Sequence, residues 1–133
     1  MRRRRPPGSA TTANVHTELI RRLRDTVGGW KIPAVHISLF GSAARGDGDI
    51  HSDIDLLIAR PAGLDPESEQ WRAQIDALAE DLRRWTGNNA GIVEISEADL
   101  PRLAQEQPPI LAELRRDAIT LTGKPSKALV RGL

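Results

Sequence analysis

The stretch GSAARGDGDIHSDIDLLI, residues 41–58, joins a glycine turn to two aspartates at the start of an apolar run. Gly41 and Ser42 follow the apolar segment AVHISLF, residues 34–40, which predicts a buried strand that stops at a turn. At such a turn the missing side chain lets backbone N–H groups approach a phosphate, and a following helix favours its negative charge. A Gly-Ser pair alone is weak evidence, because most such pairs are plain turns.

The two aspartates, Asp53 and Asp55, carry more weight than the turn. They open the segment DIDLLIA, residues 53–59, which predicts a second buried strand. Side chains two apart on a strand point to the same face, with Cα atoms roughly 6.5–7 Å apart, so both carboxylates can contact a pair of metal ions. The alternative is a solvent-facing strand with two surface acids, but unpaired carboxylates on a largely buried strand are costly.

A third carboxylate on a neighbouring strand would complete the metal site. Glu94, in the predicted strand GIVEIS, residues 91–96, has apolar strand residues on both sides and is our candidate. Alternatively, Glu94 points to solvent from an edge strand. Arg45 also has two interpretations, which are a contact with a nucleotide triphosphate and a structural pair with Asp47 or Asp49.

The rest of the chain alternates helical and strand patterns without internal repeats. Apolar spacing predicts helices over 12–27 and 66–85 and further helices that open near Pro101 and near Pro108. We expect one domain over 12–123, a disordered basic tail over 1–11 and a flexible tail over 124–133.

Composition excludes several classes of protein. Without the run Arg2–Arg5, 15 basic residues face 18 acidic ones, and the resulting net charge of −3 argues against a nucleic-acid-binding surface. There is no cysteine, so metal ligands must be oxygen or nitrogen atoms. The absence of a long apolar run and of a signal-peptide pattern predicts a cytoplasmic protein with no membrane partner.

The motif around the turn also resembles a known family. Residues 41–56 match G-S-x-A-R-G-x5-S-D-x-D-L at every fixed position, which is similar to the minimal nucleotidyltransferases of the DNA polymerase beta superfamily. The resemblance extends more loosely over 34–123. It implies an α+β fold in which a small mixed β-sheet packs against helices on one side. Many minimal members carry Asp where this chain has Glu94.

The resemblance further implies how the site works. ATP would be the donor, two Mg²⁺ ions would be held by Asp53, Asp55 and Glu94, and pyrophosphate would leave as AMP is transferred. Nucleotide contacts would come from Gly41, Ser42, Arg45 and Ser52.

The acceptor is inferred from length and composition. Relatives that modify small molecules or RNA add a helical acceptor domain, for which we expect no room here. Minimal members commonly serve as antitoxins that place AMP on a tyrosine of a HEPN toxin, and this chain has no tyrosine of its own. Two alternatives remain, which are an antitoxin that acts by contact alone and a small-molecule or RNA nucleotidyltransferase that uses a partner subunit.

Overall fold

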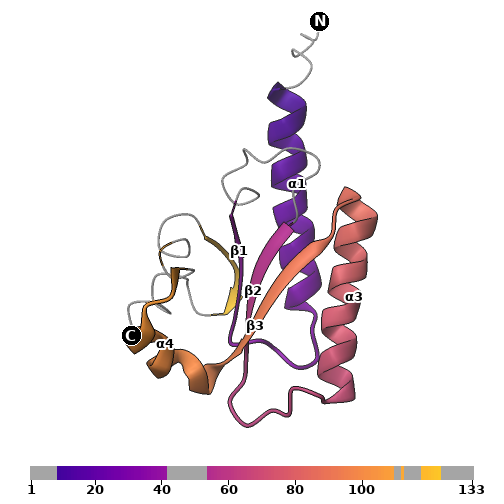
Figure 1. Cartoon of the computed structure of the whole chain (residues 1–133). Helices are drawn as coiled ribbons and strands as arrows, with labels where there is room; N and C mark the ends of the chain where they lie inside the picture. Colours follow the sequence, from indigo (N-terminus) through magenta and orange to yellow (C-terminus); the bar gives the residue numbers. More distant parts are fainter. Residues whose placement is uncertain (1–8, 42–53, 110–111, 113–117, 124–133) are drawn as a thin grey trace, which may run out of the picture.

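The computed structural model of the chain describes residues 9–41, 54–109, 112 and 118–123. Its regular elements, in chain order, are α1 (Ser9–Gly28), β1 (His36–Phe40), β2 (Ile54–Arg60), α3 (Glu69–Thr86), β3 (Ala90–Ser96), the 3₁₀ turn η1 (Glu97–Asp99), α4 (Leu100–Glu106) and β4 (Ile119–Gly123). Figure 1 shows the strands side by side with the two long helices, α1 and α3, packed along them.

The four strands form one mixed sheet in the order β3-β2-β1-β4. β1 runs antiparallel to both β2 and β4, whereas β2 and β3 are parallel because α3 connects them. This arrangement confirms the α+β class and the small mixed sheet.

Both long helices pack against one face of the sheet. Alternate side chains of the central strands face α1 and α3 and meet the apolar stripes of these helices, as expected when strand and helix periods face a shared core. The shared core consists of Leu23, Val27, Ala34, Ile37, Leu39, Ile54, Leu56, Ile58, Trp71, Ile75, Leu78, Leu82 and Leu121. Trp30 and Trp85 are partly buried and pack against this core.

The predicted element boundaries hold to within a few residues. α1 ends at Gly28 as expected, but it begins at Ser9, inside the segment predicted to be a disordered tail. The α3 helix begins after Ser68, whose hydroxyl accepts a hydrogen bond from the Trp71 backbone N–H, and ends at Gly87 with a left-handed φ of 78°.

Of two segments near the C-terminus, one differs from the prediction and the other lies mostly outside the described residues. No strand is predicted over residues 119–123 from the sequence, whereas in the structure β4 adds to the sheet edge there. The helix predicted from Pro108 lies mostly outside the described residues. In the part of the chain that the structure describes, no helix is long and apolar enough to span a membrane.

Candidate active site

The structure describes three of the seven predicted site residues. Gly41, Asp55 and Glu94 are among the described residues, while the other four, Ser42, Arg45, Ser52 and Asp53, lie outside them. Predictions that involve those four therefore stay predictions.

Gly41 and Asp55 lie next to each other on the two central strands. Phe40, the last residue of β1, pairs with Asp55 near the start of β2, and Gly41 follows directly. Gly41 has a left-handed φ of 74°, which glycine adopts without steric cost. A Cβ atom at Gly41 would lie only 2.7 Å from Oδ2 of Asp55, so the carboxylate occupies the space that the glycine leaves.

A second glycine borders the same carboxylate from the other side. Gly91 on β3 pairs with Asp55 in the parallel ladder, and a Cβ atom there would lie 2.8 Å from Oδ1. The sequence pattern marks Gly91 only as the start of a strand. A glycine inside a strand often marks a close approach, and this signal could have identified it.

Glu94 does not join Asp55, because the two residues point to opposite faces of the sheet. Ile54, Leu56 and Ile58 face the helices, so Asp55 between them faces away. Glu94 pairs with Ile58 and therefore faces the helices, and it is also displaced by three residues, roughly 10 Å, along the strand. The structure thus separates Glu94 from the predicted metal site.

Glu94 is instead the centre of a small ionic cluster. Its Oε2 accepts hydrogen bonds from Arg60 Nη1 at 2.5 Å and from the Trp71 indole N–H at 3.0 Å, and its Oε1 accepts one from Arg72 Nη2. The Glu94 side chain is 17% exposed and that of Arg60 is 15% exposed. The solvent-facing alternative is therefore also not observed, although β3 is an edge strand.

Two opposing effects act on the Glu94 carboxyl. Burial disfavours the charged form and raises the pKa, whereas hydrogen bonds from Trp71, Arg72 and Arg60 favour the charged form. The hydrogen bonds prevail, so the pKa of Glu94 lies below its usual value of 4.5. Both oxygens of the ionised Glu94 carboxylate already accept hydrogen bonds from cationic or N–H donors, so the carboxylate stabilises the fold.

The surroundings of Asp55 fit a hard divalent cation. The half-buried carboxylate lies at a glycine turn, and carboxylate oxygens are the ligands that Mg²⁺ prefers. No group of three or more acidic or histidine side chains among the described residues could by itself hold a metal ion. The predicted second ligand, Asp53, lies outside those residues.

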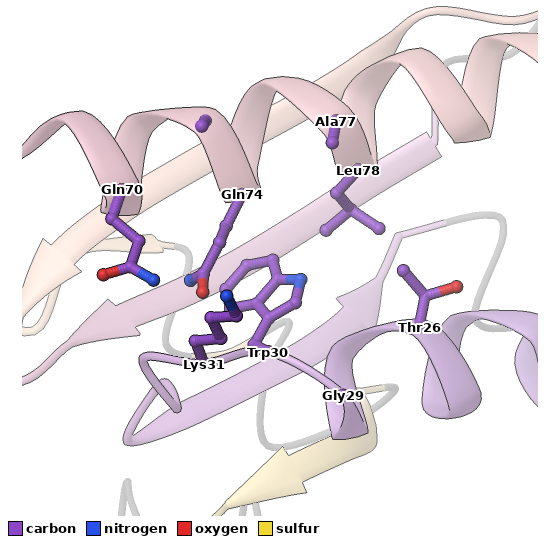
Figure 2. Close-up of a pocket in the computed structure, with 9 residues that line it drawn as sticks. Thr26, Gly29, Trp30, Lys31, Gln70, Gln74, Ala77 and Leu78 are labelled. Atoms are coloured by element: carbon purple, nitrogen blue, oxygen red, sulfur yellow. The ribbon is translucent and has the colours of Figure 1, made fainter.

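A separate groove of about 370 Å³ lies between α1 and α3. Figure 2 shows Trp30 at its centre, with Gln70, Gln74 and Leu78 of α3 on one side and Thr26 of α1 on the other. Gln74 holds the chain beside the groove by bonding the backbone N–H and carbonyl of Ile32. Neither Gly41 nor Asp55 lines the groove, so we do not assign it to the predicted nucleotide site.

The mixed sheet, the glycine turn after β1 and the aspartate near the start of β2 define a nucleotidyltransferase-type α+β domain. Residues 18–96 match the nucleotidyltransferase domain family, and the chain belongs to that family. No curated protein sequence matches the chain.

Several solved structures are similar to the chain. A toxin-antitoxin crystal structure with AMP-PNP is 19% identical, with 88% of this chain and 82% of that chain covered and a TM-score of 0.47. A nucleotidyltransferase from Sulfolobus solfataricus is 15% identical, with 86% and 88% covered and a TM-score of 0.48. A mutant of the toxin-antitoxin MntA-HpeT is 16% identical, with 88% and 82% covered and a TM-score of 0.47.

Proposed function

We propose that this chain transfers AMP from ATP to a hydroxyl group of a partner protein in a magnesium-dependent reaction. The observation that carries the proposal is the position of the Asp55 carboxylate beside the Gly41 turn. The turn begins the motif that resembles minimal nucleotidyltransferases, and Asp55 is the last acid of that motif. In this proposal a phosphate-binding turn and a metal-binding carboxylate would meet at one point between β1 and β2.

Six residues of the motif have a proposed task. Asp53 and Asp55 would hold the metal ions, and backbone N–H groups at Gly41 and Ser42, with the side chains of Arg45 and Ser52, would bind the triphosphate. Bound Mg²⁺ would supply charge neutralisation at the phosphates. The acceptor hydroxyl oxygen would bond to the α-phosphorus, the bond to pyrophosphate would break, and the hydroxyl proton would pass to solvent.

The proposed acceptor is a tyrosine of a cognate HEPN toxin, so that the chain would act as an antitoxin in the cytoplasm. Two considerations support this acceptor. The chain contains no tyrosine, so a tyrosine acceptor must belong to another molecule. Its motif also resembles that of minimal members, which commonly modify such toxins.

The test is incubation of the purified chain with ATP, Mg²⁺ and a candidate HEPN partner protein, followed by intact-mass measurement. We expect the partner to gain one or more AMP units and pyrophosphate to be released. Omission of Mg²⁺ should stop both. An unmodified partner with ATP unconsumed would contradict the proposal.

A second candidate is an antitoxin that binds nucleotide but acts by contact alone. The placement of Glu94 favours it, because the carboxylate expected to complete the metal site is bonded to Arg60 and Arg72. In that case ATP should raise the melting temperature by mass action, and the partner should be inhibited without a mass increase. Modification of a small molecule or RNA in place of the partner would indicate a small-molecule or RNA nucleotidyltransferase that uses a partner subunit.

A further inference from the structure

The Asp55 carboxylate lies in a cradle formed by two glycines, Gly41 directly after β1 and Gly91 on β3. Oδ2 lies 2.7 Å from the position of a Cβ atom at Gly41, and Oδ1 lies 2.8 Å from that position at Gly91. Both values are well below ordinary carbon–oxygen contact distances. The carboxylate therefore spans from β1 to β3 through space that any side chain at either position would fill.

We propose that Gly91 is a positioning residue, which holds the Asp55 carboxylate in its metal-binding orientation by leaving space for Oδ1. This inference rests on the proposed function, which assigns Asp55 to the metal site. Gly91 lies outside the motif that resembles nucleotidyltransferases and was not among the predicted site residues. Its part is to fix a ligand, because it has no side chain of its own to contact substrate.

The cradle restricts the carboxylate from both sides. A methyl group at Gly91 would force Oδ1 away, and the side chain could not simply shift toward β1, because Oδ2 already fills the space beside Gly41. The backbone of Asp55 is itself fixed by pairing with Phe40 and Gly91. The side-chain torsion angles of Asp55 must then change, and misplacement of a metal ligand weakens binding.

Gly91 and Gly41 differ in what a substitution would test. Gly41 has a left-handed φ, so Gly41→Ala adds backbone strain to the steric clash. Gly91 has no such φ, so Gly91→Ala tests the space beside Oδ1 alone. Gly28 offers a matched control, because a Cβ atom there would meet nothing within 4 Å.

The experiment combines thermal unfolding of the full chain with titration of Mn²⁺ in the absence of nucleotide and partner. Gly91→Ala should lower the melting temperature by roughly 3–6 °C in the wild-type background. In the Asp55→Ala background the same substitution should cost about 1 °C or less, because the clashing oxygen is gone. Mn²⁺ affinity should fall about 10- to 100-fold in Gly91→Ala and remain unchanged in Gly28→Ala.

The outcomes separate this inference from the proposed function. Equal losses of melting temperature in both backgrounds would overturn the cradle, even if the wild type transfers AMP. Coupling between Gly91 and Asp55 without Mn²⁺ binding by the wild type would overturn the metal site and the role given to Gly91. If Gly91→Ala does not fold, the added Asp55→Ala change should restore folding, and failure of both variants would contradict the inference.

Discussion

Asp55 and Glu94 are acids on neighbouring parallel strands, yet they lie in opposite kinds of environment. Asp55 faces away from the helices, and its two oxygens lie over the backbone of glycines. Glu94 faces the helices, and its two oxygens accept hydrogen bonds from two arginines and an indole. The Asp55 carboxylate lies between two glycines, whereas the Glu94 carboxylate is enclosed by donors.

The difference shows how one sheet can hold two acids on opposite faces in different electrostatic environments. Arg60 and Arg72 bring Glu94 into the interior by neutralising it, and in doing so they tie the first turn of α3 to the ends of β2 and β3. A carboxylate neutralised in this way has little attraction left for a cation. Gly41 and Gly91, which lie beside Asp55, carry no charged side chain and so do not neutralise it.

The largest expected effect is on catalysis at Asp55. Asp55→Asn should lower the rate of pyrophosphate release, in the presence of the partner, on the order of a thousandfold, because several kcal/mol of metal-derived stabilisation is lost. The matched variant Glu94→Gln should retain transfer within a few-fold. A large loss of transfer in Glu94→Gln, with the fold intact, would indicate that Glu94 takes part in the metal site, and it would contradict the placement of Glu94 and Asp55 on opposite faces of the sheet.

The next largest effect is on stability at Glu94. Glu94→Ala leaves two partly buried arginines without their shared anion, and we expect the free energy of unfolding in urea to fall by about 2–3 kcal/mol. Asp25→Ala is the control, because Asp25 and its partner Arg21 are 69% and 60% exposed. Such surface pairs contribute less than about 0.5 kcal/mol. Equal effects of the two substitutions would show that the Glu94 cluster is no more than a surface pair.

A smaller effect is expected when one of the two arginines is removed. Arg72→Ala should cost about 1 kcal/mol or less in urea unfolding, because Arg60 and Trp71 still bond Glu94 and because Arg72 is 34% exposed. Arg60→Ala should cost more, since Arg60 is the more buried partner. A larger loss of stability in Arg72→Ala than in Arg60→Ala would show that Arg72 of α3 is the main residue that neutralises Glu94.

Asp55 and Glu94 also illustrate which features of the fold the sequence could predict. The alternation of apolar residues identified β1, β2, β3 and the long helices, because strand and helix periods are local properties of the chain. The same local pattern placed Glu94 on a strand beside Asp55. It could not give the register between those strands, and a displacement by one residue moves a side chain to the opposite face.

The arginine partners of Glu94 illustrate the same limit. Arg60 and Arg72 are 34 and 22 residues from Glu94 along the chain, and no local pattern joins them to it. β4 was missed for a related reason, because ITLTG is short and is stabilised as a strand by pairing with distant β1. The apolar pattern of residues 53–59 predicted Asp55 correctly as a strand residue, and the family motif does not include Gly91.

The smallest expected effect concerns pH and again separates the two acids. The folded pKa of Glu94 is below its usual value of 4.5, so the ionised form stabilises the fold above that pH, and the contribution is lost as pH falls through the folded pKa. The effect is modest because burial opposes the hydrogen bonds that lower the pKa. The difference in urea unfolding free energy between wild type and Glu94→Gln should therefore stay constant above pH 4.5 and shrink below it. Gln keeps the shape of the side chain but does not titrate, so it isolates the charge. A difference that grows on acidification would mean that Glu94 is destabilised by burial and that the arginines do not compensate it.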